Sequence, residues 1–274
     1  MFRRELLEIV RPSRKTGGRG LELVEGTEKA GYIASGLTRD PATDKIYPIK
    51  NGYLDLLGRR TGANNVANLV NFLPGAGPLY EPLWRFHSLT LLTSERFPNE
   101  RELDAIADLV RPVPGGRYLD LGCSAGLYTR GLAAKLGNQC NVLGIDISPS
   151  MLKEAARRVE HSAVSLARAD NEDLPFADTS FSGAVCGGSL NELGDPARAL
   201  RETRRVLEPG GRVAIMGILR AKAARGRRLQ NLLSRGGVRF FEPEEVQSLL
   251  DHSGFESEPL RTYNVVFFAG AARR

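Results

Sequence analysis

The stretch Tyr118-Leu-Asp-Leu-Gly-Cys-Ser-Ala-Gly126 decides the fold of this chain. A short apolar run ends in a glycine-rich turn, and residues 126–137 have the pattern of a helix that ends on a glycine. Gly122 and Gly126 permit a sharp bend and a close approach of the backbone to a ligand. A helix that begins near residue 126 offers unpaired backbone N–H groups at its start. The stretch therefore predicts a strand, a ligand-binding turn and a helix.

Strands and helices alternate from this point to the end of the chain. Ser148 is expected to cap the helix over 148–159, with Pro149 in its first turn. Such alternation predicts right-handed crossovers and a doubly wound, mostly parallel sheet. The expected strands are 117–121, 141–147, 163–169, 180–187, 212–219, 255–263 and 264–271, and the other expected helices are 195–207 and 242–254.

The residues before 117 have a different organisation. Residues 1–60 contain short extended runs separated by Gly, Pro and Asn-Gly, which indicates a small β module with tight turns, preceded by a basic arm. Residues 61–78 are polar and turn-rich and are interpreted as a linker. A third unit, a ligand-binding domain, is expected over 79–274. It starts with helical patterning over 79–110, and Pro112 and Pro114 end that helix.

Composition excludes several classes of protein. The 274 residues are 42% apolar and 26% charged, with a net charge of +6 that mildly favours anionic partners. The three cysteines, Cys123, Cys140 and Cys186, form no CxxC pair, which argues against a zinc ribbon or a disulfide framework. No zinc or other metal is therefore expected, least of all in residues 1–60. No signal-peptide pattern or apolar run of membrane-spanning length occurs, so a soluble, cytoplasmic protein is expected.

Two acidic residues suggest which ligand the turn binds. Asp120 ends the first strand beside the turn, and Asp146 ends the second, where a carboxylate accepts hydrogen bonds from ribose hydroxyls. The turn lacks the G-x-G-x-x-G that admits a pyrophosphate, and its carboxylate disfavours a diphosphate but suits a cation. S-adenosylmethionine has an amino group and a sulfonium and no phosphate, so it fits this pattern.

The motifs LDLGCSAG, GIDISPSMLKEA, ARADNEDLPFADTSFS and ALRETRRVLEPGGRVAI resemble, in this order, those of class I S-adenosylmethionine-dependent methyltransferases. The nearest group is the ubiquinone/menaquinone-type small-molecule methyltransferases. The resemblance covers roughly residues 115–217. It implies a Rossmann-like seven-stranded sheet, mostly parallel with an antiparallel last strand, and S-adenosyl-L-methionine as cofactor. It does not identify the acceptor.

The resemblance also implies roles for individual residues. The turn would hold the methionine portion of the cofactor, the second acid its ribose, and the residues after the second and third strands its adenine. Ser124 departs from the usual middle glycine, and a serine fits at this position if its φ is negative. The implied cofactor-binding residues are Asp120, Gly122, Ser124, Gly126, Asp146, Ile147, Asp170, Asn171, Cys186 and Tyr80.

Other readings of these residues stay open. The carboxylates could cap helices or turns, and the cysteines are expected to be small core residues. Tyr80 and Trp84 could cover the cofactor or belong to the core. No catalytic residue is identified, and Glu192 and His87 are the candidates.

The acceptor is expected to be small or amphipathic. A neutral edge at Gly187–Asn191 and the apolar residues Tyr80, Leu83, Trp84 and Phe86 favour an apolar pocket. RNA methylation of the ribosomal guanine type is the alternative enzyme, and an inactive cofactor-binding scaffold is the alternative of another class. The segment 219–228 has five basic and no acidic residues; it is either a solvated helix face or an anion-binding lid. The run YPIKNGYLDLL resembles the end of zinc-ribbon modules that precede some methyltransferases, here without the cysteines. The oligomeric state is left open.

Overall fold

A computed structural model describes residues 1–13, 19–58, 92–93, 95–137, 140–159 and 163–274. The expected linker over 61–78 lies outside these residues. So do five side chains expected near the site, namely Tyr80, Leu83, Trp84, Phe86 and His87. The predictions for them therefore stay predictions.

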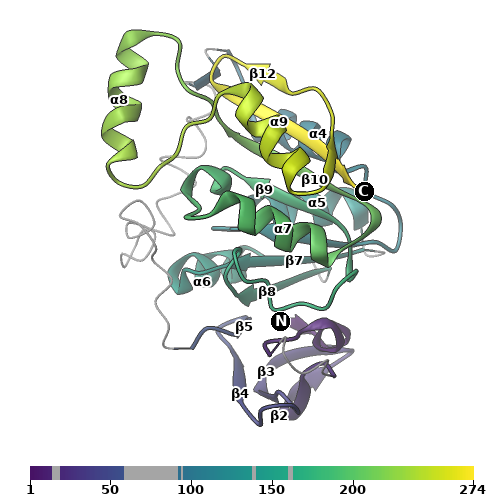
Figure 1. Ribbon diagram of the computed structural model, residues 1–274. Helices are drawn as coiled ribbons and strands as arrows, with labels where there is room; N and C mark the ends of the chain where they lie inside the picture. Colours follow the sequence, from purple (N-terminus) through teal and green to yellow (C-terminus); the bar gives the residue numbers. More distant parts are fainter. Residues whose placement is uncertain (14–18, 59–91, 94, 138–139, 160–162) are drawn as a thin grey trace.

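The centre of the molecule is the predicted doubly wound sheet (Figure 1). Neighbouring strands are parallel from β8 to β10, while β13 is antiparallel to both of its neighbours. The seven strands run, in spatial order, β8 (Val164–Arg168), β7 (Asn141–Asp146), β6 (Arg117–Leu121), β9 (Phe181–Gly187), β10 (Leu207–Ile218), β13 (Val266–Arg273) and β11 (Phe255–Ser257). The expected antiparallel last strand is confirmed. The segment expected to form a single strand over 255–263 contains two, β11 and β12 (Arg261–Tyr263), and both pair with β13.

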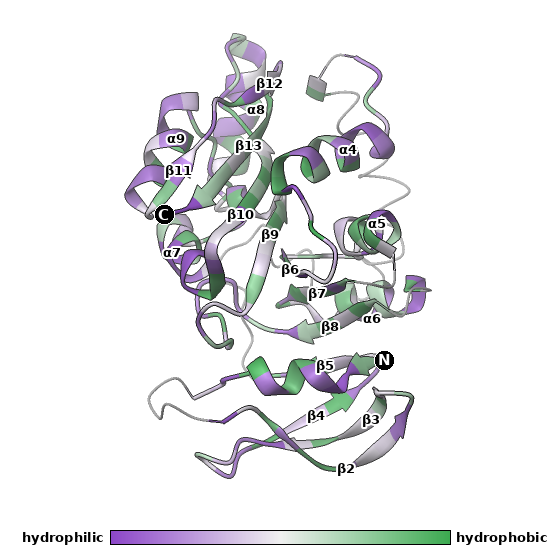
Figure 2. Cartoon of the chain, turned by 90° about the vertical axis from the view of Figure 1, so that its right-hand side faces the viewer, coloured by the Kyte–Doolittle hydropathy of each residue, from purple (hydrophilic) through white to green (hydrophobic). Residues whose placement is uncertain are grey.

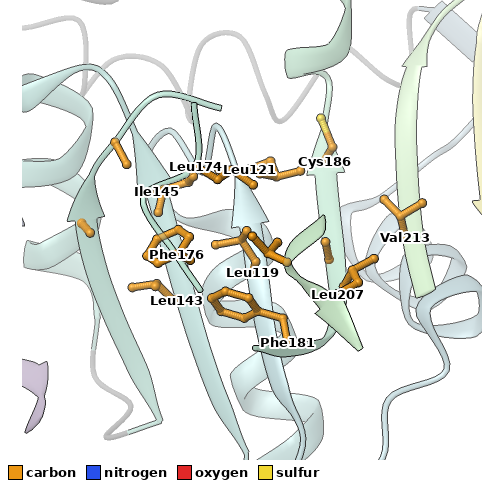
Figure 3. Packing of buried hydrophobic residues seen from close by; sticks show 14 of the residues in the cluster. Leu119, Leu121, Leu143, Ile145, Leu174, Phe176, Phe181, Cys186, Leu207 and Val213 are labelled. Carbon is orange, nitrogen blue, oxygen red and sulfur yellow. The ribbon is translucent and has the colours of Figure 1, made fainter. Parts of the chain in front are cut away.

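Two hydrophobic clusters cover the two faces of this sheet. Leu119 and Leu121 belong to one cluster and Tyr118 to the other, as expected when successive side chains point to opposite faces. Figure 3 shows the first cluster, where Leu143 and Ile145 of β7 lie beside Leu119 and Leu121 of β6. Helices α7 (Pro196–Val206) and α9 (Pro243–His252) contribute to this cluster, and α4 (Asn99–Val110), α5 (Leu127–Leu136) and α6 (Pro149–Arg158) to the other.

The start of α6 confirms a local prediction. The Ser148 hydroxyl accepts a hydrogen bond from the backbone N–H of Met151 at 3.3 Å, and Pro149 occupies the first turn. This cap satisfies one of the backbone donors that a helix start leaves unpaired. The helix consequently begins directly after β7, with its N-terminus at the carboxyl edge of the sheet.

The N-terminal strands continue the same sheet. They are β1 (Phe2–Arg3), β2 (Glu22–Lys29), β3 (Tyr32–Arg39), β4 (Ile46–Lys50) and β5 (Tyr53–Asp55), with a 3-10 helix over Arg4–Ile9. The predicted Asn-Gly turn joins β4 to β5, with Asn51 and Gly52 both at positive φ. β5 then pairs in parallel with β8, which places Leu54 opposite Ala167 and Asp55 opposite Arg168. The N-terminal strands therefore extend the edge of the central sheet, and both figures place them below β8 (Figures 1 and 2). The domain boundary at residue 60 stays a prediction.

No helix in the described part of the chain is long and apolar enough to cross a membrane.

Candidate active site

The site lies where the strand order reverses. β7 and β8 follow β6 on one side, and β9 and β10 lie on its other side, so the reversal falls between β6 and β9. In open parallel sheets ligands bind at this point, beyond the carboxyl ends of the strands. Every described residue of the predicted site falls at this edge. Asp120, Asp146 and Cys186 lie at the carboxyl ends of β6, β7 and β9, and the others lie in the segments that directly follow β6, β7, β8 and β9.

The glycine-rich turn alternates between left-handed and ordinary backbone. Gly122, Ser124 and Gly126 have φ angles of +65°, +49° and +83°. The condition of a negative φ at Ser124 is therefore not met, and this serine occupies a conformation that favours glycine. A Cβ added to Gly122 would lie 2.2 Å from the Ser189 Oγ, so the backbone here is packed too closely for any side chain.

Asp146 holds this turn in place. Its Oδ2 accepts a hydrogen bond from the Ser124 backbone N–H at 2.9 Å, and its Oδ1 accepts one from the Ser148 N–H at 2.8 Å. Burial raises the pKa of the carboxyl, and the backbone hydrogen bonds oppose that shift. Because each carboxylate oxygen has two lone pairs, each keeps one for a further donor such as a ribose hydroxyl. Asp146 thus unites the two loops between which a ligand would lie.

Asp120 is buried beside the turn. It is 1% exposed, and its Oδ2 accepts a hydrogen bond from the Thr129 hydroxyl of α5 at 2.5 Å. This contact fixes the carboxylate against the first turn of the helix. A negative charge held there favours a cationic group near the turn.

Asp170 and Asn171 follow β8. The Oδ1 of Asp170 accepts a hydrogen bond from the Glu172 N–H at 2.9 Å. The pKa of this carboxyl is raised, and burial is the main cause of the shift. Asn171 is 8% exposed, and its Nδ2 lies 3.3 Å from the position of a Cβ on Gly122. Its Oδ1 is buried, and no donor in the described residues hydrogen-bonds to it. A buried acceptor without a partner costs roughly 1–3 kcal/mol, which a ligand donor would recover.

Ile147 is positioned by a residue that the sequence did not single out. The guanidinium of Arg168, 4% exposed, donates to the Ile147 carbonyl at 2.9 Å and to the Gly58 carbonyl at 2.5 Å. It also pairs with Asp55, at 3.4 Å between Nη1 and Oδ1. The loop after β7 is thereby tied to the end of β5. A lone arginine in the apolar run AVSLARA was the available signal.

The thiols near the site are held in the core. Cys186 is 3% exposed, and burial raises its pKa to about 12, while burial raises the pKa of Cys123 as well. Both are protonated at neutral pH, so neither is an activated nucleophile. Asn171 and Cys186 border the same narrow apolar gap. In the pairing of β9 with β6, Cys186 lies opposite Leu121, the residue directly before the glycine turn.

Glu192 ends a 3-10 helix, Ser189–Glu192, that follows β9. Burial, with a smaller contribution from the Asp146 carboxylate, raises the pKa of Glu192 to about 7. The neighbouring Asn191, 2% exposed, was expected to line an open pocket but is instead bonded into the structure. Its Nδ2 donates to the carbonyls of Ile218 at 2.9 Å and Arg239 at 2.6 Å. Glu192 is therefore a carboxyl directly after β9 whose raised pKa suits proton transfer near neutral pH.

These residues fit the predicted cofactor. A tight backbone cradle, a buried carboxylate beside it, a second carboxylate with spare lone pairs and an orphaned amide oxygen lie along one edge of the sheet. Within the described residues no three His, Cys, Asp or Glu side chains gather to form a metal site, and the expected absence of zinc stays a prediction.

Comparisons with known proteins find a methyltransferase domain in the same part of the chain. Residues 119–215 match the model of a methyltransferase domain family. A demethylmenaquinone methyltransferase of Desulfitobacterium hafniense is 36% identical over 108 residues, 38% of this chain and 43% of that protein. A 2-phytyl-1,4-naphtoquinone methyltransferase of Synechococcus elongatus is 39% identical over 111 residues, 39% of this chain and 48% of that protein. The match thus spans less than half the length of these curated relatives.

A solved structure supports the fold over a longer stretch. The phosphoethanolamine N-methyltransferase 2 of Haemonchus contortus, solved in complex with S-adenosyl-L-methionine, superposes with a TM-score of 0.57 at 17% identity. The alignment covers 73% of this chain and 60% of that one. The two chains therefore share the fold of the sheet described above.

Proposed function

We propose that this chain, which contains a class I methyltransferase domain, is an enzyme that transfers a methyl group from S-adenosyl-L-methionine to a small lipophilic acceptor of the quinone type. The observation that carries the proposal is Asp146, whose carboxylate joins the glycine turn to the loop after β7 and keeps lone pairs for a ribose. The names of the quinone methyltransferases with similar domains support the acceptor class.

In this proposal each predicted residue has a defined contact. Gly122, Ser124 and Gly126 cradle the methionine portion, and Asp120 orients its amino group. Asp146 binds the ribose hydroxyls, and Ile147 packs on the adenine. The remaining contacts, to the adenine amino group and near the sulfonium, belong to Asp170, Asn171 and Cys186. Tyr80 remains a proposed cover of the cofactor.

The cofactor, when bound, supplies an electrophilic methyl group on a sulfonium. The protein contributes alignment, exclusion of water and removal of a proton. We assign proton removal to Glu192, because its pKa near 7 lets it accept a proton from an acidic hydroxyl or carbon at neutral pH. His87, the other candidate, remains a proposed alternative.

Calorimetry with S-adenosyl-L-methionine and its demethylated product tests the proposal directly. Asp146→Ala removes the acceptors of two charge-assisted hydrogen bonds to the ribose, each worth ~1.5–3 kcal/mol, and should weaken binding by at least about tenfold. Because the same change also releases the Ser124 and Ser148 N–H groups, the variant's unfolding must be measured in parallel. A variant that stays folded and binds with unchanged affinity would exclude the ribose role. Incubation with a demethylated naphthoquinol then tests transfer.

A cytoplasmic location belongs to the same proposal. Cys123, Cys140 and Cys186 are free and buried thiols, the state that reducing compartments maintain. The division into a β module over 1–60, a linker over 61–78 and a catalytic domain over 79–274 is likewise proposed. Limited proteolysis between residues 59 and 91 tests it.

A further inference from the structure

The chain leaves the central sheet between β10 and α9 and forms a basic projection over residues 219–239. Both ends of this projection are fixed to the active-site edge. The Asn191 side chain donates to the carbonyls of Ile218 and Arg239, and the Arg220 N–H donates to the Phe241 carbonyl at 2.8 Å. The projection is therefore anchored next to Glu192, on the side of the site where the acceptor is proposed to enter.

Helix α8 (Ala224–Ser234) forms the outer part of the projection and stands away from the body of the molecule (Figure 1). Of its residues, Gln230 alone is buried, and its amide holds the Leu219 carbonyl and the Ala221 N–H. Leu229, Leu232 and Leu233 are 59%, 61% and 43% exposed. Their spacing of three and four residues places them on one side of the helix. These three, the α8 leucines, form an apolar stripe that faces solvent.

Basic side chains surround the α8 leucines. Residues 219–239 contain seven Lys or Arg and no Asp or Glu. Arg220 pairs with Glu242 at 3.2 Å. For the others, no described carboxylate lies within ion-pair distance: Lys222, Arg225, Arg227, Arg228, Arg235 and Arg239. The projection thus combines an apolar stripe with a local positive charge that the rest of the described chain does not neutralise.

This combination decides which partner fits. A helix with leucines on one side and arginines around them binds in the plane of an anionic lipid interface. Recognition of single-stranded RNA uses aromatic side chains on which bases stack, and residues 219–239 contain none. A partner protein without strong negative charge would leave the arginines unmatched.

We propose that α8 docks this protein on the surface of an anionic phospholipid bilayer, with the α8 leucines in the interfacial region and the surrounding arginines on lipid phosphates. The proposed function gives this docking its purpose, because a quinone-type acceptor dissolves in the bilayer. The docking surface itself follows from the exposure and charge of α8 and does not depend on catalysis.

The experiment measures binding of the full chain to vesicles. Vesicles of phosphatidylcholine alone are compared with vesicles containing 30% phosphatidylglycerol. Binding to each is measured at about 0.1 M salt, where the electrostatic screening length is about 10 Å, and at about 0.5 M salt, where it falls below about 5 Å. We expect binding to the anionic vesicles at low salt, and at least about tenfold less on neutral vesicles or at high salt. Equal binding to both vesicle types, or no binding to either, overturns the proposal.

Matched variants assign the binding to α8. The triple change Leu229→Ser, Leu232→Ser and Leu233→Ser should weaken vesicle binding by at least about tenfold, because serine side chains have little apolar surface to bury in the bilayer interface. Changing Arg225, Arg227 and Arg228 to Gln should weaken it about fivefold per residue, and changing them to Lys should preserve it. Val24→Ser, at a residue 56% exposed on β2, is the control for loss of an exposed apolar side chain.

Two further readouts separate the alternatives. Circular dichroism checks that each variant is folded, and calorimetry measures cofactor binding by the parent protein. If the proposed function is wrong but the docking proposal is right, the parent binds anionic vesicles and does not bind the cofactor. If the α8 leucine variant converts a dimer into a monomer, or the parent binds RNA tightly, while anionic vesicles are not bound, the docking proposal is wrong.

Discussion

Replacement of Arg168 by Met tests whether the N-terminal strands stabilise the loop after β7, which contains Ile147. Among the described residues, the guanidinium contacts the carbonyls of Ile147 and Gly58 and the carboxylate of Asp55. Both charged side chains of the ion pair are nearly buried, at 5% and 10% exposure. Removing one member of a buried ion pair costs about 3–5 kcal/mol, because the remaining charge stays buried. The carboxylate keeps hydrogen bonds from the N–H groups of Leu57 and Gly58 at 3.2 and 2.9 Å, which places the expected loss near the lower end, at about 3 kcal/mol.

Urea or thermal unfolding measures this loss, and calorimetry measures the affinity for the cofactor. Because the Ile147 carbonyl loses its donor, we expect about tenfold weaker binding, equivalent to 1.4 kcal/mol. Asp55→Asn in the Arg168→Met background should recover part of the stability, because it removes the charge that was left unpaired. The difference from additive effects should be a coupling energy of roughly 0.5–3 kcal/mol.

Arg261→Met is the control for this change. Arg261 pairs with Asp108 at 3.4 Å, and both side chains are exposed, at 43% and 67%, an arrangement worth about 0.2–1 kcal/mol. A loss of less than about 1 kcal/mol in Arg168→Met would show that the buried pair does not fasten the two regions.

Three further changes test the site. Ser124→Gly should raise the free energy of unfolding by about 1 kcal/mol, because glycine adopts a left-handed backbone without strain. Ser124→Ala keeps the Cβ and should not raise it. Equal unfolding midpoints for the wild type and both variants would show that Ser124 is not strained. Gly122→Ala should both destabilise the fold and abolish cofactor binding, since its Cβ would overlap Ser189, and calorimetry detecting normal affinity would contradict the close packing. Burial raises the pKa of Glu192 from 4.5 to about 7, so its charge opposes folding, and the wild type should lose up to about 3 kcal/mol relative to Glu192→Gln as pH rises between these values. The same variant should lower turnover by 10²–10⁴-fold, as is usual for loss of a general base, and parallel pH–stability and pH–rate profiles of wild type and variant would argue against both statements.

Much of the central sheet could be predicted because its signals are local. The alternation of Tyr118 with Leu119 follows from the two-residue period of a strand, and the structure divides these side chains between two cores. The Ser148–Pro149 pair gives the start of α6 because a cap needs only neighbouring residues. The mostly parallel sheet with an antiparallel last strand came from the resemblance of ordered motifs and is confirmed by the pairing.

What could not be predicted depends on partners distant in the sequence. The left-handed Ser124 is fixed by a carboxylate 22 residues away that accepts its N–H, and nothing in G-C-S-A-G indicates that contact. Burial of Arg168 results from β5, 113 residues earlier, which pairs at the open edge of β8. Burial of Asn191 likewise requires the return of the chain at Arg239.

The N-terminal strands and the basic projection that carries α8 contact opposite sides of the active site. Changes in the two segments should therefore affect different steps, cofactor binding and acceptor delivery. The N-terminal strands contact the loop after β7 through Arg168, where the proposed adenine contact lies. The basic projection that carries α8 is anchored by Asn191, next to the proposed proton acceptor after β9. Changes to Arg168 should therefore alter the cofactor affinity at a constant KM for a water-soluble quinol, whereas changes to the α8 leucines should alter turnover of bilayer-dissolved quinol at a constant cofactor affinity. If the α8 leucine variant turned over bilayer-dissolved quinol as fast as the wild type does, the projection would have no part in acceptor delivery.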